Sequence, residues 1–93
     1  MKRTEINKSF KELGFTLMRS YENGKVKKIF TKEVTTHKGH FLTKVTFGEN
    51  IRIKSQSKYG NRIEFYTYAE FFKFKSVNDF IKTFWWAVRK ANN

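Results

Sequence analysis

Apolar residues recur at helical spacing near both ends of the sequence and alternate with polar residues between them. Ile6, Phe10 and Leu13 follow the i, i+4, i+7 spacing of one helical face, which predicts a short helix ending at about Leu13. Thr4 precedes this stripe as an N-cap residue. Gly14 follows it and can adopt the left-handed conformation that ends many helices. The first expected element is therefore a short helix closed by a glycine.

A broader apolar stripe predicts a second helix in the last fifth of the sequence. Ser76 and Asp79 form an S-x-x-D capping box at its start. Its apolar positions, at i, i+3, i+4, i+7, i+8 and i+11, are Val77, Phe80, Ile81, Phe84, Trp85 and Val88. Each large apolar side chain contributes about 1.5–3 kcal/mol when it is fully buried. We therefore expect this helix to hold down whatever sheet lies beneath it.

Runs typical of strands, separated by turn signals, occupy the middle of the chain. Asn23-Gly24 is a strong hairpin signal, because both central residues of that turn tolerate positive φ. Residues 25–36 also fit a helical stripe, but this turn and their β-branched content favour a strand. The expected strands are residues 15–22, 25–36, 40–47, 51–57 and 62–69, with 70–74 as an optional extension of the last. Short connections predict that neighbouring strands pair as an antiparallel meander.

These elements predict one α+β domain over residues 1–93, in the order α-β-β-β-β-β-α. A curved antiparallel sheet of about five strands would carry the N-terminal and the C-terminal helix on one face, because each element must hide its apolar side. The other sheet face would then meet water, and it is the first place to look for binding chemistry.

Composition indicates what such a face could bind. The chain has 20 Lys and Arg against 8 Asp and Glu, a net charge of +12, and it carries 11 Phe, 4 Tyr and 2 Trp. Phosphate backbones attract cations, and bases stack on aromatic rings. There is no Cys, which excludes disulfides and Cys-based zinc sites. The sequence shows no secretory signal and no membrane-spanning run, so we expect a cytoplasmic protein with no membrane contact.

Alternation in the last two strands gives a first set of candidate binding residues. It assigns Ile51, Ile53, Ile63, Phe65 and Ala69 to the covered face. The opposite face would carry Arg52, Lys54, Gln56, Lys58, Arg62, Glu64, Tyr66 and Tyr68, joined by His40, Leu42, Lys44 and Thr46 of the preceding strand. Cations there could contact phosphates while the two tyrosines stack on bases. The alternative is that the tyrosines form cross-strand pairs and the charges are only solvated.

Trp86 is a second candidate, on the polar side of the second helix. Its helical neighbours are Lys82, Arg89 and Lys90, so it could stack on a base while these cations contact phosphates. It could equally form intramolecular cation–π contacts, pack at the core margin or contact a partner subunit.

Five lysines form a third predicted basic patch: Lys25, Lys27, Lys28, Lys32 and Lys38. Lysine is a hydrated point charge that contacts phosphates without reading base edges, so we expect weak sequence specificity. The alternative is that this patch only confers solubility.

His37 and His40 raise the question of metal or acid–base chemistry. Their spacing spans a predicted turn, and Glu33 is the nearest further ligand, so three zinc ligands are not available together. Two histidines could support acid–base RNA cleavage. We expect surface turn residues here, with no metal, no cofactor and no catalytic residue.

The opening stretch resembles a known family. Lys2, the Lys-Glu-Leu-Gly-Phe segment at 11–15 and Leu-Met-Arg at 17–19 are similar to the start of HicA-type mRNA interferase toxins. That resemblance implies a small α/β fold like that of double-stranded-RNA-binding domains. The catalytic Gly-Ser-His-His segment of the family would fall at residues 22–25, where neither His nor Ser is present. No catalytic residue is carried over, and the family is not adopted.

The hypothesis we favour is a small basic protein that binds DNA or RNA with low sequence specificity. An alternative is a phage or mobile-element protein that inhibits or adapts a host or defence protein by docking on an acidic or nucleic-acid-binding surface. A third hypothesis is a ribonuclease that uses His37 or His40. An edge strand or Trp86 could also support a homodimer.

Overall fold

The computed structural model describes the backbone of residues 1–91 and the side chains of residues 1–84. It contains a short 3₁₀ turn, three helices and five strands. In chain order these are η1 (Arg3–Glu5), α1 (Ile6–Glu12), β1 (Thr16–Glu22), β2 (Lys25–Thr36), β3 (Gly39–Phe47), β4 (Ile51–Ser57), β5 (Gly60–Tyr66), α2 (Tyr68–Phe72) and α3 (Val77–Ala91).

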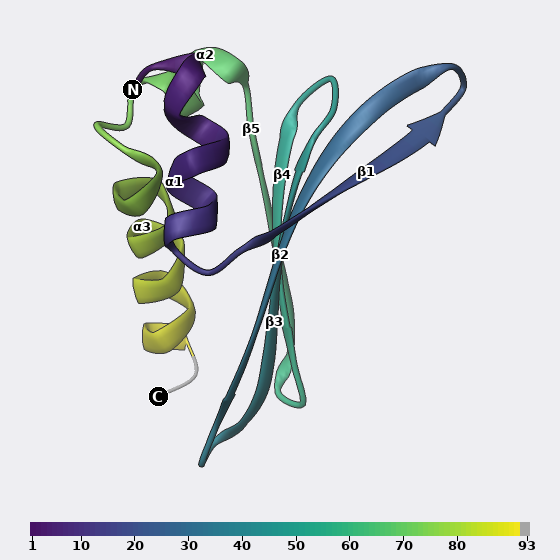
Figure 1. The fold of residues 1–93 in the computed structure, drawn as a ribbon. Helices are drawn as coiled ribbons and strands as arrows, with labels where there is room; N and C mark the ends of the chain where they lie inside the picture. The colour runs from purple at the N-terminus through teal and green to yellow at the C-terminus, as the bar shows by residue number, and fades with distance from the viewer. Residues whose placement is uncertain (92–93) are drawn as a thin grey trace.

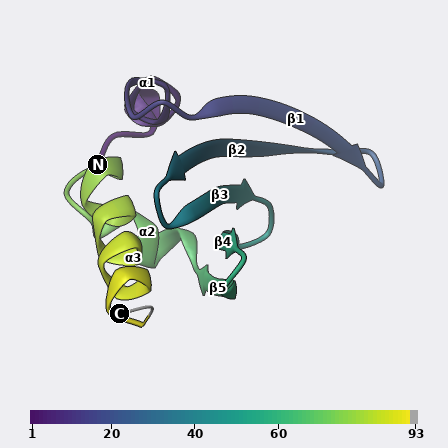
Figure 2. The same ribbon diagram turned by 90° about the horizontal axis from the view of Figure 1, so that it is seen from below.

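The five strands form one sheet in the order β1-β2-β3-β4-β5, and every neighbouring pair is antiparallel. The helices lie together on one side of the sheet, while the β1–β2 hairpin projects away from them (Figures 1 and 2). The predicted α+β fold, with a helix at each end of an antiparallel meander, is therefore confirmed. We call the side that the helices cover the inner face and the opposite side the open face.

Turn chemistry explains why the turn of the first hairpin was predicted to the residue. Asn23 and Gly24 have φ values of 51° and 73°, as a tight hairpin turn with two left-handed central residues requires. The strand that follows occupies Lys25–Thr36, the predicted range. The strand interpretation of these residues was therefore correct and the helical one wrong.

The end of α1 is the predicted glycine cap. Gly14 has a φ of 89°, its N–H donates to the Lys11 carbonyl at 3.0 Å, and the Phe15 N–H donates to the Phe10 carbonyl at 3.0 Å. These two bonds define a Schellman motif, and they press the Phe15 ring edge-on against Phe10 at 5.2 Å. Thr4 is not the N-cap: it lies inside η1, and Glu5 precedes α1 without a side-chain cap.

The core lies between the helices and the inner face. Phe10 of α1 stacks on Phe30 of β2 at 4.2 Å, and Phe71 of α2 meets Phe80 of α3 edge-on at 5.0 Å. The buried apolar side chains are Phe10, Phe15, Phe30, Val45, Ile51, Ile53, Phe71, Val77, Phe80, Ile81 and Phe84. The first four apolar positions predicted for the second helix are thus in the core. The predicted core positions Trp85 and Val88 lie outside the described side chains.

Helix α2 replaces the predicted extension of the last strand. Thr67 and Glu70 form a reciprocal capping box, in which the Thr67 hydroxyl accepts from the Glu70 N–H at 3.1 Å and the Glu70 carboxylate accepts from the Thr67 N–H at 3.0 Å. This T-x-x-E pattern is a helix-start signal in the sequence that the strand interpretation overlooked. The chain therefore leaves the sheet at Tyr66.

The inward and outward residues of β5 are also the reverse of those predicted. The expected turn had three residues, 59–61, but Ser57 pairs with Gly60 across a two-residue loop. A change of one residue in the loop exchanges the two faces of the returning strand. Arg62, Glu64 and Tyr66 therefore face inward, and Ile63 and Phe65 face outward, with exposed fractions of 46% and 66%.

Candidate nucleic-acid interface

The open face is the side of the sheet that the helices do not cover (Figures 1 and 2). Side chains of directly paired residues project to the same side of a sheet, so the register defines this face. One row across the five strands contains Met18, Ile29, Thr46, Arg52 and Phe65. The next row contains Thr16, Thr31, Lys44, Lys54 and Ile63. Cations therefore occupy the centre of the face, and apolar side chains flank them.

Three of these cations form what we call the cation cluster: Lys44, Arg52 and Lys54. Lys44 and Lys54 are directly opposite each other in the β3–β4 register, and Arg52 is two residues from Lys54 on the same strand. Like charges in directly opposite positions destabilise a sheet. Among the described side chains, the salt bridges involve none of the three. The cluster therefore presents concentrated positive charge that no carboxylate contact neutralises.

An exposed aromatic ring lies beside the cation cluster. Phe65 is directly opposite Arg52 in the β4–β5 register, and 66% of its surface is exposed. The predicted alternation of this strand placed Phe65 in the core. The structure reverses this placement, because the loop between β4 and β5 has two residues and its length is known only from the register.

One ion pair lies on the open-face side of the projecting hairpin, next to its turn. Lys27 Nζ donates to Glu22 Oε2 at 2.8 Å. This hydrogen bond, together with the charge of Lys27 and smaller contributions from Arg52 and Lys44, holds the pKa of Glu22 below its ordinary value. The charges of the cluster therefore stabilise the ionised form of Glu22, although its salt bridge is with Lys27.

Tyr66 and Arg62, predicted for the binding surface, instead belong to an inward-facing polar triad with Glu64. Arg62 Nη2 donates to Glu64 Oε1 at 2.7 Å, and the Tyr66 hydroxyl donates to Glu64 Oε2 at 2.5 Å. The Tyr66 ring packs edge-on against Phe80 at 5.2 Å, and the Arg62 guanidinium lies 5.8 Å from the Phe84 ring centroid. This triad seals the margin of the core beside α3, so its position under the helices contradicts the predicted outward orientation.

Tyr68 is likewise not on the open face, because it begins α2 instead of continuing the strand. Its hydroxyl donates to the Gly48 carbonyl at 2.6 Å, which ties the start of α2 to the β3–β4 turn. The two tyrosines predicted to stack on bases therefore both have structural contacts elsewhere.

The remaining predicted cations lie in different places. Lys58 is in the β4–β5 loop, where its Nζ is 5.2 Å from the Tyr59 ring centroid. Lys82 is exposed on α3, in the helical layer on the other side of the sheet from the cation cluster. Trp86, Arg89 and Lys90 lie outside the described side chains, so the patch predicted around Trp86 is not placed.

The predicted lysine patch is divided by strand alternation. Lys25 and Lys27 are on the open-face side of β2, whereas Lys28 and Lys32 are on the inner side. Lys32 Nζ donates to the Leu13 carbonyl at 2.6 Å and so satisfies an acceptor at the end of α1. Lys38 lies in the exposed β2–β3 turn. The five lysines are therefore not one patch.

Both histidines are exposed at the β2–β3 turn, as predicted. His40 Nε2 is 3.6 Å from Glu33 Oε2, and its Nδ1 is 3.1 Å from Thr35 Oγ1. Within the described residues, no three His, Asp or Glu side chains lie close enough to hold a metal ion. Nor does the described part of the chain contain a helix long and apolar enough to cross a membrane.

Comparison of the chain with protein-family models, with curated proteins and with solved structures finds no match. The assignment of the candidate interface therefore depends on the positions and charges of its residues alone.

Proposed function

We propose that the protein binds nucleic acid through the open face, with low sequence specificity. The cation cluster of Lys44, Arg52 and Lys54 contacts backbone phosphates, and Phe65 stacks on a neighbouring base. Two lysines and one arginine on an exposed sheet face attract phosphates of any sequence. The proposal implies a cytoplasmic protein, as expected from the sequence.

The observation that carries this proposal is the directly opposed Lys44–Lys54 pair without a carboxylate contact in the described structure. Repulsion between the two lysines disfavours folding. A bound polyanion relieves this repulsion, and the relief contributes to the free energy of binding. Phe65 adds the apolar ring that single-strand binders use to hold bases.

The decisive experiment compares two variants that each lose three positive charges. In the first, Lys44, Arg52 and Lys54 are changed to Gln; in the control, Lys11, Lys73 and Lys75, exposed on the helical side, are changed to Gln. Each phosphate contact contributes about fivefold at about 0.15 M salt, so the first variant should bind labelled oligonucleotides about a hundredfold more weakly. Fluorescence anisotropy with single- and double-stranded DNA and RNA measures this. Equal weakening in both variants, or none in the first, contradicts the proposal.

A second comparison tests the stacking role of Phe65. Phe65→Ala should weaken binding to single strands by about 1–3 kcal/mol, the range for loss of one stacked base. Tyr21→Ala removes an equally accessible ring from the inner side of the hairpin, and it should leave binding unchanged. Identical affinity in Phe65→Ala and the wild type would remove Phe65 from the site.

The exposed pair of Ile63 and Phe65 on an edge strand supports a second candidate function, inhibition or adaptation of a host or defence protein. Edge strands with exposed apolar residues are common docking sites for other chains. A stoichiometric partner that the wild type retains from nuclease-treated lysate, and that Ile63→Ser loses, would favour this function over nucleic-acid binding.

A further inference from the structure

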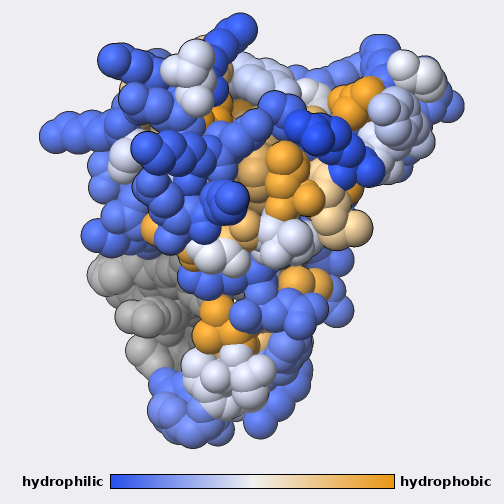
Figure 3. All heavy atoms as spheres, viewed as in Figure 1, coloured by the Kyte–Doolittle hydropathy of each residue, from blue (hydrophilic) through white to orange (hydrophobic). Residues whose placement is uncertain are grey.

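A cleft of about 490 Å³ opens on the inner face, on the opposite side of the sheet from the cation cluster. It lies where α1 and α2 stop covering β2, because this strand runs on into the projecting hairpin (Figure 1). Figure 3 shows apolar surface between the helical layer and that hairpin, bordered by hydrophilic side chains. The volume is within the range of about 300–1,000 Å³ that small-molecule sites occupy.

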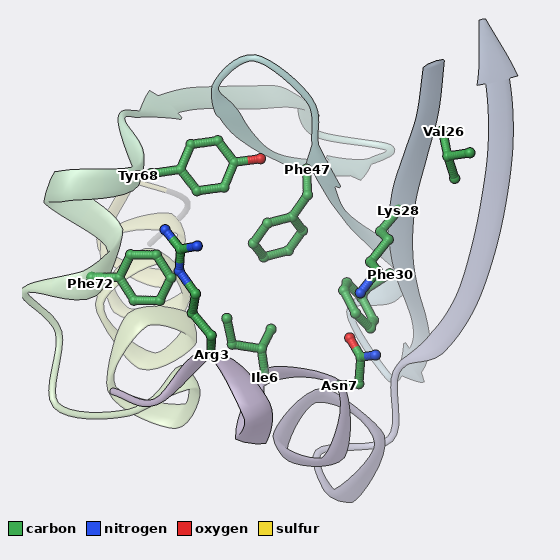
Figure 4. Close-up of a pocket in the computed structure, with 9 residues that line it drawn as sticks. All are labelled: Arg3, Ile6, Asn7, Val26, Lys28, Phe30, Phe47, Tyr68 and Phe72. Carbon is green, nitrogen blue, oxygen red and sulfur yellow. The ribbon is translucent and has the colours of Figure 1, made fainter. Parts of the chain in front are cut away.

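The walls of the cleft are largely aromatic. Phe30, Phe47, Tyr68 and Phe72 all line it, and Figure 4 shows their rings arranged around an open centre. Phe47 is fixed by edge-on contacts with Phe30 at 5.7 Å and with Phe71 at 5.4 Å. Tyr68 is held by its hydrogen bond to Gly48. These rings are preorganised, so a planar ligand could pack on them without reordering the site.

Two cations stand at opposite sides of this aromatic cleft. Arg3 approaches from η1, with its guanidinium 5.3 Å from the Phe72 ring centroid, and Lys28 approaches from β2 (Figure 4). Lys28 is also directly opposite Arg19 in the β1–β2 register, a second like-charged pair. Among the described side chains, no Asp or Glu lines the cleft, and neither Arg3 nor Lys28 forms a salt bridge. The cleft therefore combines aromatic packing with unneutralised positive charge.

We propose that this cleft binds the nucleoside monophosphate group, with the base against the aromatic wall and the phosphate attracted by the positive charge of Arg3 and Lys28 at its two sides. An aromatic ring and an anion joined in one small molecule match both features of the cleft. The Asn7 amide, which also lines it, offers a donor and an acceptor to a base edge. The group could be a free nucleotide or the phosphorylated end of a strand. This inference uses none of the open-face residues, so it stands or fails separately from the proposed function.

The test is a titration of the full chain with adenosine 5′-monophosphate. Binding is measured by isothermal titration calorimetry and by changes in amide chemical shifts in NMR spectra. Adenosine and ribose 5-phosphate, each lacking one half of the ligand, should both bind more weakly. Changing Arg3 and Lys28 to Gln should weaken binding about tenfold or more, since at least one charged hydrogen bond to the phosphate is lost. The matched control, Lys11 and Lys25 to Gln, should stay within about twofold of the wild type. Phe72→Leu keeps an apolar side chain in place but removes the ring on which Arg3 packs, so it should weaken the nucleotide more than it weakens ribose 5-phosphate.

Three results would overturn the inference. They are no saturable binding of the nucleotide, equal binding of ribose 5-phosphate, and amide shifts confined to residues outside the cleft. The triple variant Lys44→Gln, Arg52→Gln, Lys54→Gln separates this site from the open face, because it should retain nucleotide binding. In that variant, binding of a 5′-phosphorylated strand but not of its 5′-hydroxyl form would identify a strand end as the ligand. Binding of the free nucleotide alone would identify a mononucleotide.

Discussion

At the scale of single residues, the polar triad of Arg62, Glu64 and Tyr66 shows how burial and hydrogen bonding act together. Burial raises the pKa of Tyr66, and its hydrogen bond to Glu64 raises it further, to about 12. Burial alone would also raise the pKa of Glu64, but hydrogen bonds from Tyr66 and Arg62 outweigh this effect and hold it below its ordinary value. The phenol is therefore a protonated donor to a carboxylate throughout the neutral range.

This arrangement predicts a loss of stability at alkaline pH. The phenol of the unfolded chain ionises near 10.0 and that of the folded chain near 12, so the contribution of Tyr66 is complete below 10.0 and falls as pH rises towards 12. In urea unfolding series over this range, Tyr66→Phe should show a shallower decline in the free energy of unfolding than the wild type. Tyr59→Phe, in an exposed turn, is the matched control. Parallel declines in Tyr66→Phe and wild type would contradict the prediction.

At the scale of elements, side-chain caps decide where the helices begin. The Ser76 hydroxyl accepts from the Asp79 N–H at 3.1 Å at the start of α3, and Thr67 and Glu70 cap α2. Helix α1 has no such side-chain cap at its start. Since α3 contributes Val77, Phe80, Ile81 and Phe84 to the core, its cap stabilises the element that covers the sheet.

Ser76→Ala should therefore destabilise the fold by about 1 kcal/mol, the usual cost of losing an N-cap. For a domain of this size, that corresponds to a fall of about 4–8 °C in the melting temperature. Ser9→Ala makes the same chemical change inside α1, where Ala is the better helix former, and it should cause no loss. Thermal unfolding followed by circular dichroism compares the two, and an unchanged melting temperature in Ser76→Ala would count against the cap.

At the scale of the whole molecule, two of the surfaces that carry cations have different neighbours. On the open face, cations accompany one exposed ring and aliphatic side chains. On the inner face, Arg3 and Lys28 border an aromatic cleft. The first surface suits an extended polyanion, and the second suits a compact ligand.

Salt dependence distinguishes the cation cluster from charge spread over the whole molecule. With about five phosphate contacts, raising salt from about 50 to about 200 mM should weaken duplex binding on the order of several hundredfold. Changing Lys44, Arg52 and Lys54 to Gln should make the slope of log K against log salt shallower by about 2–3. The control with Gln at 11, 73 and 75 should keep the wild-type slope. Equal slopes in the two variants, both shallower than that of the wild type, would mean that net charge alone drives binding.

Much of the fold was predictable because its signals are local. The Asn23-Gly24 turn, the Gly14 cap and the stripe from Val77 to Phe84 each act within a few residues, and each led to a correct element. The candidate site was predicted only in part. Lys44, Arg52 and Lys54 do face outward together, whereas Arg62, Tyr66 and Tyr68 do not. The errors at Arg62 and Tyr66 arise from the length of the β4–β5 loop, and the error at Tyr68 from the overlooked capping box.

The sequence by itself thus determined the five strands, the first and last helices, their order and the antiparallel pairing, because backbone turns, caps and apolar periodicity depend on near neighbours. Only the tertiary structure decided which face of β5 meets the helices, that Phe65 and not Tyr66 adjoins the cation cluster, and that Arg3 and Lys28 face each other across a cleft. Those outcomes depend on register and on packing between residues distant in the chain. A shift of one residue in a loop exchanges the two faces of a strand and leaves its composition unchanged.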